Sequence, residues 1–168
     1  MIVDVLKKSR ITLCRLLEAV LIVAVFVLVI DVLWGVFTRY ALGEQAAWSE
    51  ELARFLLIWI SLLGGAVAFG EKAHLGVDYF VGLFDSSARK MMAVFAQFVV
   101  LFFAVSIFVI GGTRIVVENL QMGQTSPALG LQMGHVYLVL PIAGAFMIIF
   151  TVERLLEIVL SKQQGGMD

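Results

Sequence analysis

Cysteine, histidine, proline and charged residues are all scarce in this sequence. Its 168 residues include one cysteine, two histidines and two prolines, and only 15% of them are charged, against about 25% in soluble domains. A single cysteine, Cys14, excludes an intramolecular disulfide and argues against a thiolate metal cluster. The net charge of -1, with no concentration of basic residues, argues against binding to nucleic acid.

Apolar residues are what the sequence has in excess, at 61%. They gather in four runs, which predict transmembrane helices over residues 13–37, 48–69, 91–114 and 136–160. At about 1.5 Å per residue, each run is long enough to cross a hydrocarbon core of about 30 Å. The first run exceeds the 7–15 apolar residues or so of a signal peptide, and no small-residue cleavage site follows it, so we expect an uncleaved helix.

The segment between the second and third runs, residues 74–84, is apolar but too short to span a membrane. Two glycines and an aspartate interrupt it, and we predict that it lies at the membrane interface. The expected fold is therefore an all-α integral membrane protein, in which residues 1–168 form one four-helix transmembrane domain with a short interfacial segment. A domain of this kind has membrane lipid as a constant partner.

The distribution of basic residues predicts which way the chain crosses the membrane. If the N-terminus is cytoplasmic, the cytoplasmic side holds nine bases and the outer side three. Because cytoplasmic loops carry the excess of Lys and Arg, both termini are expected in the cytoplasm. The nine are Lys7, Lys8, Arg10, Arg15, Lys72, Arg89, Lys90, Arg154 and Lys162, and the three are Arg39, Arg54 and Arg114.

Asp31 stands inside the first apolar run, where a charge is costly without a partner. If Tyr40 and Trp48 mark the outer interface, Asp31 and Arg54 lie about 13 Å and about 9 Å below it. The structural interpretation is a charge pair between the first two helices, and the functional one is a proton or ion relay. We favour the structural interpretation, because the neighbours of Asp31 are apolar. A second candidate partner for Asp31 is Arg114.

Charged residues also collect where the second helix begins. Glu50 and Arg54 are four residues apart and can pair on one helical face, as can Arg114 and Glu118. This leaves Arg39 and Glu51 as the more available charges at the outer side. They form either a solvated helix start or an edge where another protein docks.

Small residues form faces on two of the predicted helices. Ser61, Gly64 and Gly65 lie on the second, and Gly144 lies on the fourth, after Pro141, which is able to kink a helix. Small residues let helices approach closely in membranes. The pattern predicts helix packing but does not say whether the neighbouring helix belongs to this chain or to another subunit.

Catalytic and cofactor sites find no support in the sequence. His74 and His135 are predicted on opposite sides of the membrane, so they cannot ligate one haem iron, which argues against a redox-enzyme anchor. No residues have the spacing of a metal site, a phosphate loop or a catalytic triad. We therefore expect no enzyme, no metal and no cofactor.

Four pieces of the sequence, in this order and spacing, resemble the small membrane subunit of tripartite ATP-independent periplasmic (TRAP) transporters, also called DctQ or SiaQ. They are Arg39-Tyr40, Trp48-Ser-Glu-Glu-Leu-Ala-Arg54, His74-Leu-Gly-Val-Asp78 and Ser126-Pro-Ala-Leu-Gly-Leu131.

This resemblance implies an accessory scaffold in the bacterial inner membrane, in a heterotrimeric complex. Its partners would be a large membrane subunit, which imports organic anions such as carboxylates with a sodium gradient, and a periplasmic substrate-binding protein. The residues expected near the docking site of the binding protein are Arg39, Trp48, Glu50, Glu51 and Arg54.

The residues themselves leave a different class of function open. A self-sufficient small carrier or channel would need a homo-oligomer that lines its path with Asp31. The substrate, the choice between Arg54 and Arg114 as partner of Asp31, and the helix faces that meet a partner are not predicted.

Overall fold

The computed structural model describes residues 2–44, 46–71 and 86–164, with side chains in 10–44, 46–71 and 91–156. Four helical segments within these ranges are long and apolar enough to span a membrane, as predicted. The first is α1 (Ile2–Phe37) with the π-helical turn η1 (Thr38–Leu42), and the second is α2 (Ala47–Gly70). The third runs through α4 (Ser86–Phe103), the π-helix η2 (Ala104–Gly111) and α5 (Gly112–Gln121), and the fourth through α6 (Met133–Tyr137) and α7 (Val139–Gln164).

The predicted helix boundaries hold best for the second segment, which differs from 48–69 by one residue at each end. The first segment is longer than predicted, because the basic stretch before residue 13 is already helical. The third is also longer at both ends than 91–114. The interfacial segment predicted over 74–84, including His74, lies outside the described residues.

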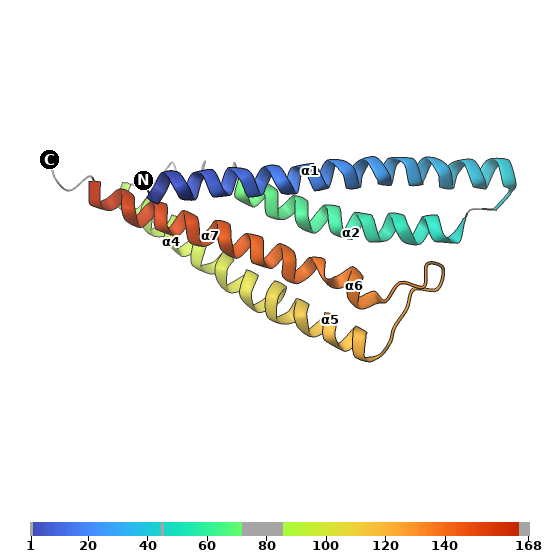
Figure 1. The fold of residues 1–168 in the computed structure, drawn as a ribbon. Helices are drawn as coiled ribbons and strands as arrows, with labels where there is room; N and C mark the ends of the chain where they lie inside the picture. The colour runs from blue at the N-terminus through green and yellow to red at the C-terminus, as the bar shows by residue number, and fades with distance from the viewer. Residues whose placement is uncertain (1, 45, 72–85, 165–168) are drawn as a thin grey trace.

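The segments run up and down in an elongated bundle (Figure 1). α1 packs against α2, α2 packs against α7, and α7 packs against α4 and η2. We call the end that carries residues 38–46 and 122–132 the loop end, and the end where α1 begins and α7 finishes the terminal end. Toward the loop end the α1–α2 pair diverges from α5 and α6, and the 122–132 connection reaches back toward α2 (Figure 1).

Apolar contacts among α1, α2 and α7 make the core of the bundle. The three helices pack closely at Gly70, where an added Cβ would lie 2.8 Å from the Phe150 ring and 3.0 Å from Cys14 Sγ. The buried members of this core are Cys14, Leu17, Leu63, Val67, Val139, Ala143 and Phe150.

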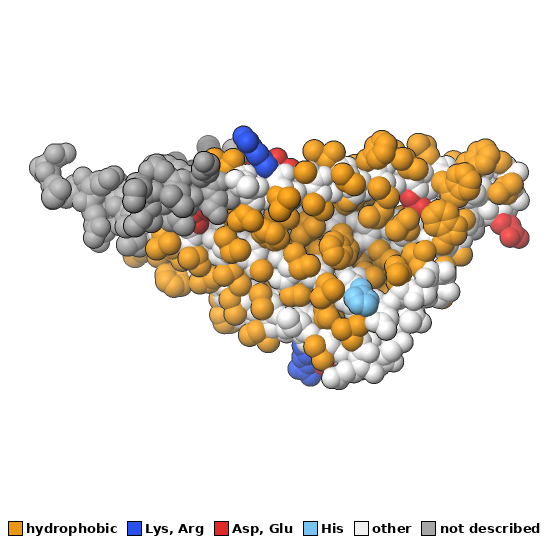
Figure 2. Space-filling view, in the orientation of Figure 1, with side chains coloured by type: hydrophobic (Ala, Val, Ile, Leu, Met, Phe, Trp, Pro, Cys, Tyr) orange, Lys and Arg blue, Asp and Glu red, His pale blue; other side chains and the backbone are white. Residues whose placement is uncertain are grey.

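Most large apolar side chains nevertheless face outward. Along α1, for example, the exposed fractions of Ile22, Phe26 and Leu33 are 70%, 65% and 64%. Hydrophobic side chains dominate the face seen in Figure 2, with few charges among them. Such a surface is stable only against lipid or another membrane protein, as the membrane fold requires.

The π-helix η2 widens the third segment where it meets the fourth. Near its end, the Thr113 hydroxyl lies within hydrogen-bond distance of two of its carbonyl oxygens, those of Val109 at 2.6 Å and Ile110 at 3.0 Å. π-helical turns are rare and have no sequence signature comparable to that of an α-helix. The sequence therefore did not indicate it.

The fourth segment is interrupted at Leu138, three residues before Pro141, so α6 and α7 are separate helices. A proline inside a helix lacks the N–H that would bond to the carbonyl four residues earlier, and this agrees with the kink expected at Pro141. Next to the break, Trp59 Nε1 donates to the Val136 carbonyl oxygen at 3.1 Å and ties α2 to α6.

The small residues of the two predicted packing faces have different surroundings. Gly144 is buried in the chain, and a Cβ added there would lie 2.6 Å from Phe108 Cβ. At Gly64 and Gly65 an added Cβ would meet nothing within 4 Å, and Ser61 on the same helix is exposed. Gly144 thus packs α7 on η2, whereas the α2 face has no neighbour among the described residues.

These surroundings predict opposite effects of the same substitution. Gly144→Ala is expected to destabilise the isolated chain by about 1–3 kcal/mol, because the new methyl overlaps Phe108. Gly65→Ala, the matched control, is expected to leave stability unchanged or slightly raised, since alanine favours the helix by up to about 1 kcal/mol. Thermal unfolding of both variants in detergent measures the difference, and equal midpoints would contradict the packing described here.

Candidate functional site: the loop end

The Glu51 carboxylate joins α2 to the 122–132 connection. Its Oε1 accepts a hydrogen bond from the Ala128 amide and its Oε2 accepts one from the Leu129 amide, both at 3.0 Å. The side chain is only 8% exposed. Hydrogen bonds to an ionised group are stronger than those between neutral groups, so this contact holds together two segments more than seventy residues apart.

The 122–132 connection, which Glu51 binds, is also ordered by hydrogen bonds within its residues 126–131. The Ser126 amide donates to the Leu131 carbonyl at 2.8 Å, and the Gly130 amide donates to the Ser126 carbonyl at 3.0 Å. The Leu131 amide donates in turn to Ser126 Oγ at 3.2 Å. Gly130 has φ +66°, which glycine adopts without strain, so the turn closes there.

The expectation that Glu51 is one of the more available outer charges is therefore wrong. The sequence places it at the start of a helix, where an acid is ordinarily solvated, but the fold brings the backbone amides of residues 128 and 129 to it. Two signals in the sequence are consistent with this contact. The connection lacks any charge of its own, and its serine, proline and glycines shape a turn that exposes amides.

Two arginines at the loop end, Arg54 and Arg114, bind acids on their own helices, as their spacing predicts. Arg54 pairs with Glu50 at 3.2 Å and Arg114 with Glu118 at 2.8 Å, and all four side chains are substantially exposed. The charge pair expected between Asp31 and Arg54 or Arg114 is consequently not formed. An acid four residues away on the same helix is reached without crossing between helices, and both arginines use it.

Asp31 is instead buried and unpaired. It is 4% exposed, and neither carboxylate oxygen has a hydrogen-bond partner among the described residues. Its backbone carbonyl accepts a hydrogen bond from Ser49 Oγ at 3.1 Å, which seats the start of α2 against α1. Asp31 also lines a pocket of about 290 Å³ between these two helices, together with Arg39, Tyr40, Ser49 and Glu50 among others.

The other residues predicted for docking are at the surface. Trp48 is 41% exposed, and Arg39, Glu50 and Arg54 are exposed too. Gly43, with φ +83°, makes the turn between η1 and α2 beside them. These side chains and the 126–131 turn lie at the same end of the molecule.

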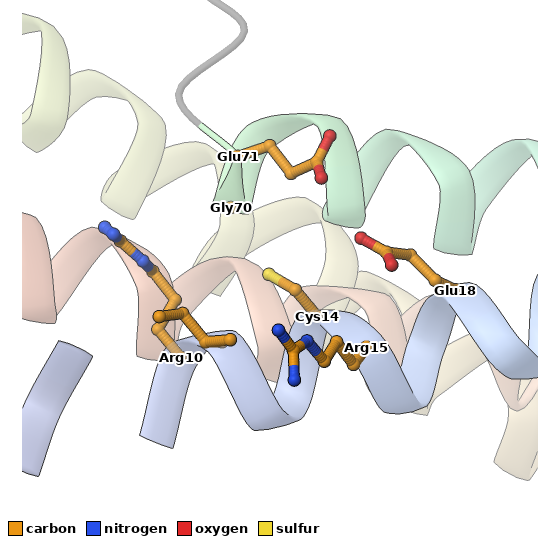
Figure 3. A pocket seen from close by; sticks show the side chains of 7 residues that line it. Arg10, Cys14, Arg15, Glu18, Gly70 and Glu71 are labelled. Atoms are coloured by element: carbon orange, nitrogen blue, oxygen red, sulfur yellow. The ribbon is translucent and has the colours of Figure 1, made fainter. Parts of the chain in front are cut away.

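A second pocket, of about 590 Å³, lies at the terminal end between α1 and α2 (Figure 3). α1 contributes Arg10, Cys14, Arg15 and Glu18 to it, and the end of α2 contributes Gly70 and the residue after it, Glu71. Arg10 also lies 3.9 Å from Glu153 of α7. In the described part of the chain, no three side chains of histidine, cysteine, aspartate or glutamate gather as metal ligands would.

The fold defines a multi-pass membrane protein whose polar groups gather mainly at its two ends. The family model "Tripartite ATP-independent periplasmic transporters, DctQ component" matches residues 28–161. Because this match spans most of the chain, the protein belongs to the DctQ family of TRAP transporter small subunits.

Individual relatives agree with this assignment. The sialic acid TRAP transporter small permease protein SiaQ of Vibrio cholerae is 27% identical over 127 residues, 74% of this chain and 70% of that protein. The C4-dicarboxylate TRAP transporter small permease protein DctQ of Pseudomonas aeruginosa is 28% identical over 142 residues, 78% of this chain and 62% of that protein. The isethionate TRAP transporter permease protein DctMQ of Oleidesulfovibrio alaskensis is 30% identical over 144 residues, 83% of this chain but only 22% of that longer protein.

The Glu51 contact predicts a difference between two neighbouring acids. Glu51→Gln replaces one acceptor oxygen with an amino group that cannot accept from Ala128 or Leu129, so the 126–131 turn should open more often. Hydrogen–deuterium exchange is expected to become several-fold faster at these two amides. Glu50→Gln, the control, removes only an exposed ion pair and should leave their exchange unchanged. Equal exchange in both variants would show that Glu51 does not hold the turn.

Proposed function

We propose that this chain is the accessory scaffold subunit of a TRAP-type importer, in which it braces a large membrane subunit. The match to DctMQ carries the proposal, because there a sequence like this one forms about a fifth of a longer permease protein. Joining in one chain is consistent with a stable association between two membrane parts. The outward apolar surface and the unpartnered α2 face at Gly64 and Gly65 suit such an association.

The loop end fits a second role, which is to help dock a periplasmic substrate-binding protein. Arg39, Trp48, Glu50 and Arg54 offer exposed charges and an aromatic ring there. Glu51 would act differently from these four, because its carboxylate is occupied by the 126–131 turn. Its contribution is to keep that turn in one conformation, which lowers the entropy cost of binding.

The complex would take up an organic anion, such as a carboxylate, with a sodium gradient across the bacterial inner membrane. The named relatives act on sialic acid, C4-dicarboxylates and isethionate, all of which are anions, and this supports the class of substrate. With the loop end in the periplasm and both termini in the cytoplasm, the positive-inside rule is satisfied.

A homo-oligomeric carrier remains the alternative, and the buried unpaired carboxylate of Asp31 favours it. Intramembrane acids do mark ion pathways. The two functions differ in what the chain does alone.

Copurification and a transport assay distinguish the scaffold subunit from the homo-oligomeric carrier. Tagged chain, extracted from its native membrane in mild detergent, is expected to bring a large polytopic membrane protein in roughly equal amount. Liposomes that hold this chain alone should take up no organic anion above the level of empty liposomes. Purification with copies of itself only, together with robust uptake, would establish the carrier instead.

The membrane orientation is tested by labelling engineered cysteines. In a Cys14→Ser background, Glu44→Cys at the loop end should react with a membrane-impermeant maleimide in intact spheroplasts. Glu71→Cys at the terminal end should react only after the membrane is permeabilised. Both positions are exposed, so access to the reagent depends on the side of the membrane. The reverse pattern would place the termini in the periplasm.

A further inference from the structure

The Asp31 carboxylate has no polar partner among the described residues of this chain. Both of its oxygens are buried without a hydrogen-bond partner in the described part of the molecule, well inside a membrane-spanning segment. A lone charge or polar group in such surroundings costs several kcal/mol. The residue therefore needs a partner that the isolated chain does not provide.

The two arginines that the sequence suggested as partners of Asp31 do not provide it. Arg54 is bound to Glu50 and Arg114 to Glu118. The charged groups that share its pocket are Arg39 and Glu50, and neither makes an ion pair with it. Arg39 is exposed and lies about two helical turns beyond Asp31 along the first segment.

The pocket opens toward the surroundings of the bundle. Val32 and Val36, which also line it, are 48% and 49% exposed and belong to the outward apolar surface of α1. Its volume of about 290 Å³ exceeds the roughly 30 Å³ share of a single water molecule several times over. A long side chain from an adjacent transmembrane helix therefore has room to enter.

We propose that a lysine or arginine side chain of the large membrane subunit enters this pocket between α1 and α2 and pairs with the Asp31 carboxylate. The carboxylate itself is covered in the isolated chain, so pairing requires the Asp31 side chain to turn toward the pocket that it lines. This proposal rests on the proposed function, because it needs a large membrane partner.

The depth of Asp31 selects this partner over others. It precedes Tyr40 by nine residues, which is about 13 Å along a helix, and interfacial aromatics lie at headgroup level. A soluble binding protein or a lipid ammonium group stays near that level. A resident metal ion would need several oxygen ligands, and in the described part of the chain no three side chains of histidine, cysteine, aspartate or glutamate lie together as metal ligands would. A transmembrane neighbour reaches the required depth directly.

The test compares the full chain alone with the full complex. Asp31→Asn removes the charge, so the isolated chain is expected to unfold at the same or a higher temperature than the wild type. Its affinity for the purified large subunit, titrated in lipid nanodiscs, should fall at least about thirtyfold, as expected for a buried charge left without its partner. Asp31→Glu should restore most of the affinity, and Glu44→Gln, which removes an exposed acid outside the pocket, should bind as the wild type does.

Two results would overturn the proposal. Equal affinity of wild type and Asp31→Asn would show that no cation of the partner uses this carboxylate. A lower unfolding temperature of isolated Asp31→Asn, with affinity lost only in proportion to the unfolded fraction, would place the partner inside the chain, with Arg39 the first candidate. If wild-type chain fails to bind any large membrane protein, the proposed function fails as well, which is a different outcome from either of these.

Discussion

The structure depends on one constraint, which is that a polar group inside a membrane must find its partner within protein. Side chains of the described helices meet it mostly through backbone carbonyls. Ser49 donates to Asp31, Trp59 to Val136 and Thr151 to Met147. The first two of these bonds also join different helices, so the same contacts that satisfy polar groups fix how the helices sit. Among the described residues, Asp31 is the buried carboxylate that this arrangement leaves with both oxygens unsatisfied.

Glu51 shows the constraint acting at the boundary with water. Two backbone amides of an irregular turn would lose hydrogen bonds wherever the turn packs on the bundle, and a carboxylate at the start of α2 accepts both. A chain segment without charges of its own is thereby ordered by a charge from elsewhere. The interaction is specific to the position of Glu51, because Glu50, its neighbour in sequence, binds Arg54 instead.

Apolar runs predict the helices of this protein well, because the length of a spanning helix is set by the bilayer. The predicted bounds of the second helix, 48–69, differ from the observed ones by one residue at each end. The sequence was least informative where tertiary contacts decide. It did not indicate the π-helix over Ala104–Gly111, and it assigned Glu51 to the surface because the amides that bind it lie more than seventy residues away. The Asp31–Arg54 pair was expected from depth alone, but a nearer acid on the same helix competes for the arginine.

The surroundings of the small residues also depend on tertiary contacts, and they bear on how the chain packs in a complex. Gly144 and Gly65 look alike in sequence, yet one is closed in by Phe108 and the other faces open space. Glycine in the middle of a helix costs stability relative to alanine, so an open glycine gains nothing from the isolated fold. Asp31 is unfavourable in the isolated chain in the same way, since its burial costs free energy that no described contact returns. Both features become favourable if a neighbouring helix packs closely on α2 and carries a base to α1, and a subunit that functions as a scaffold for a larger membrane protein would have both.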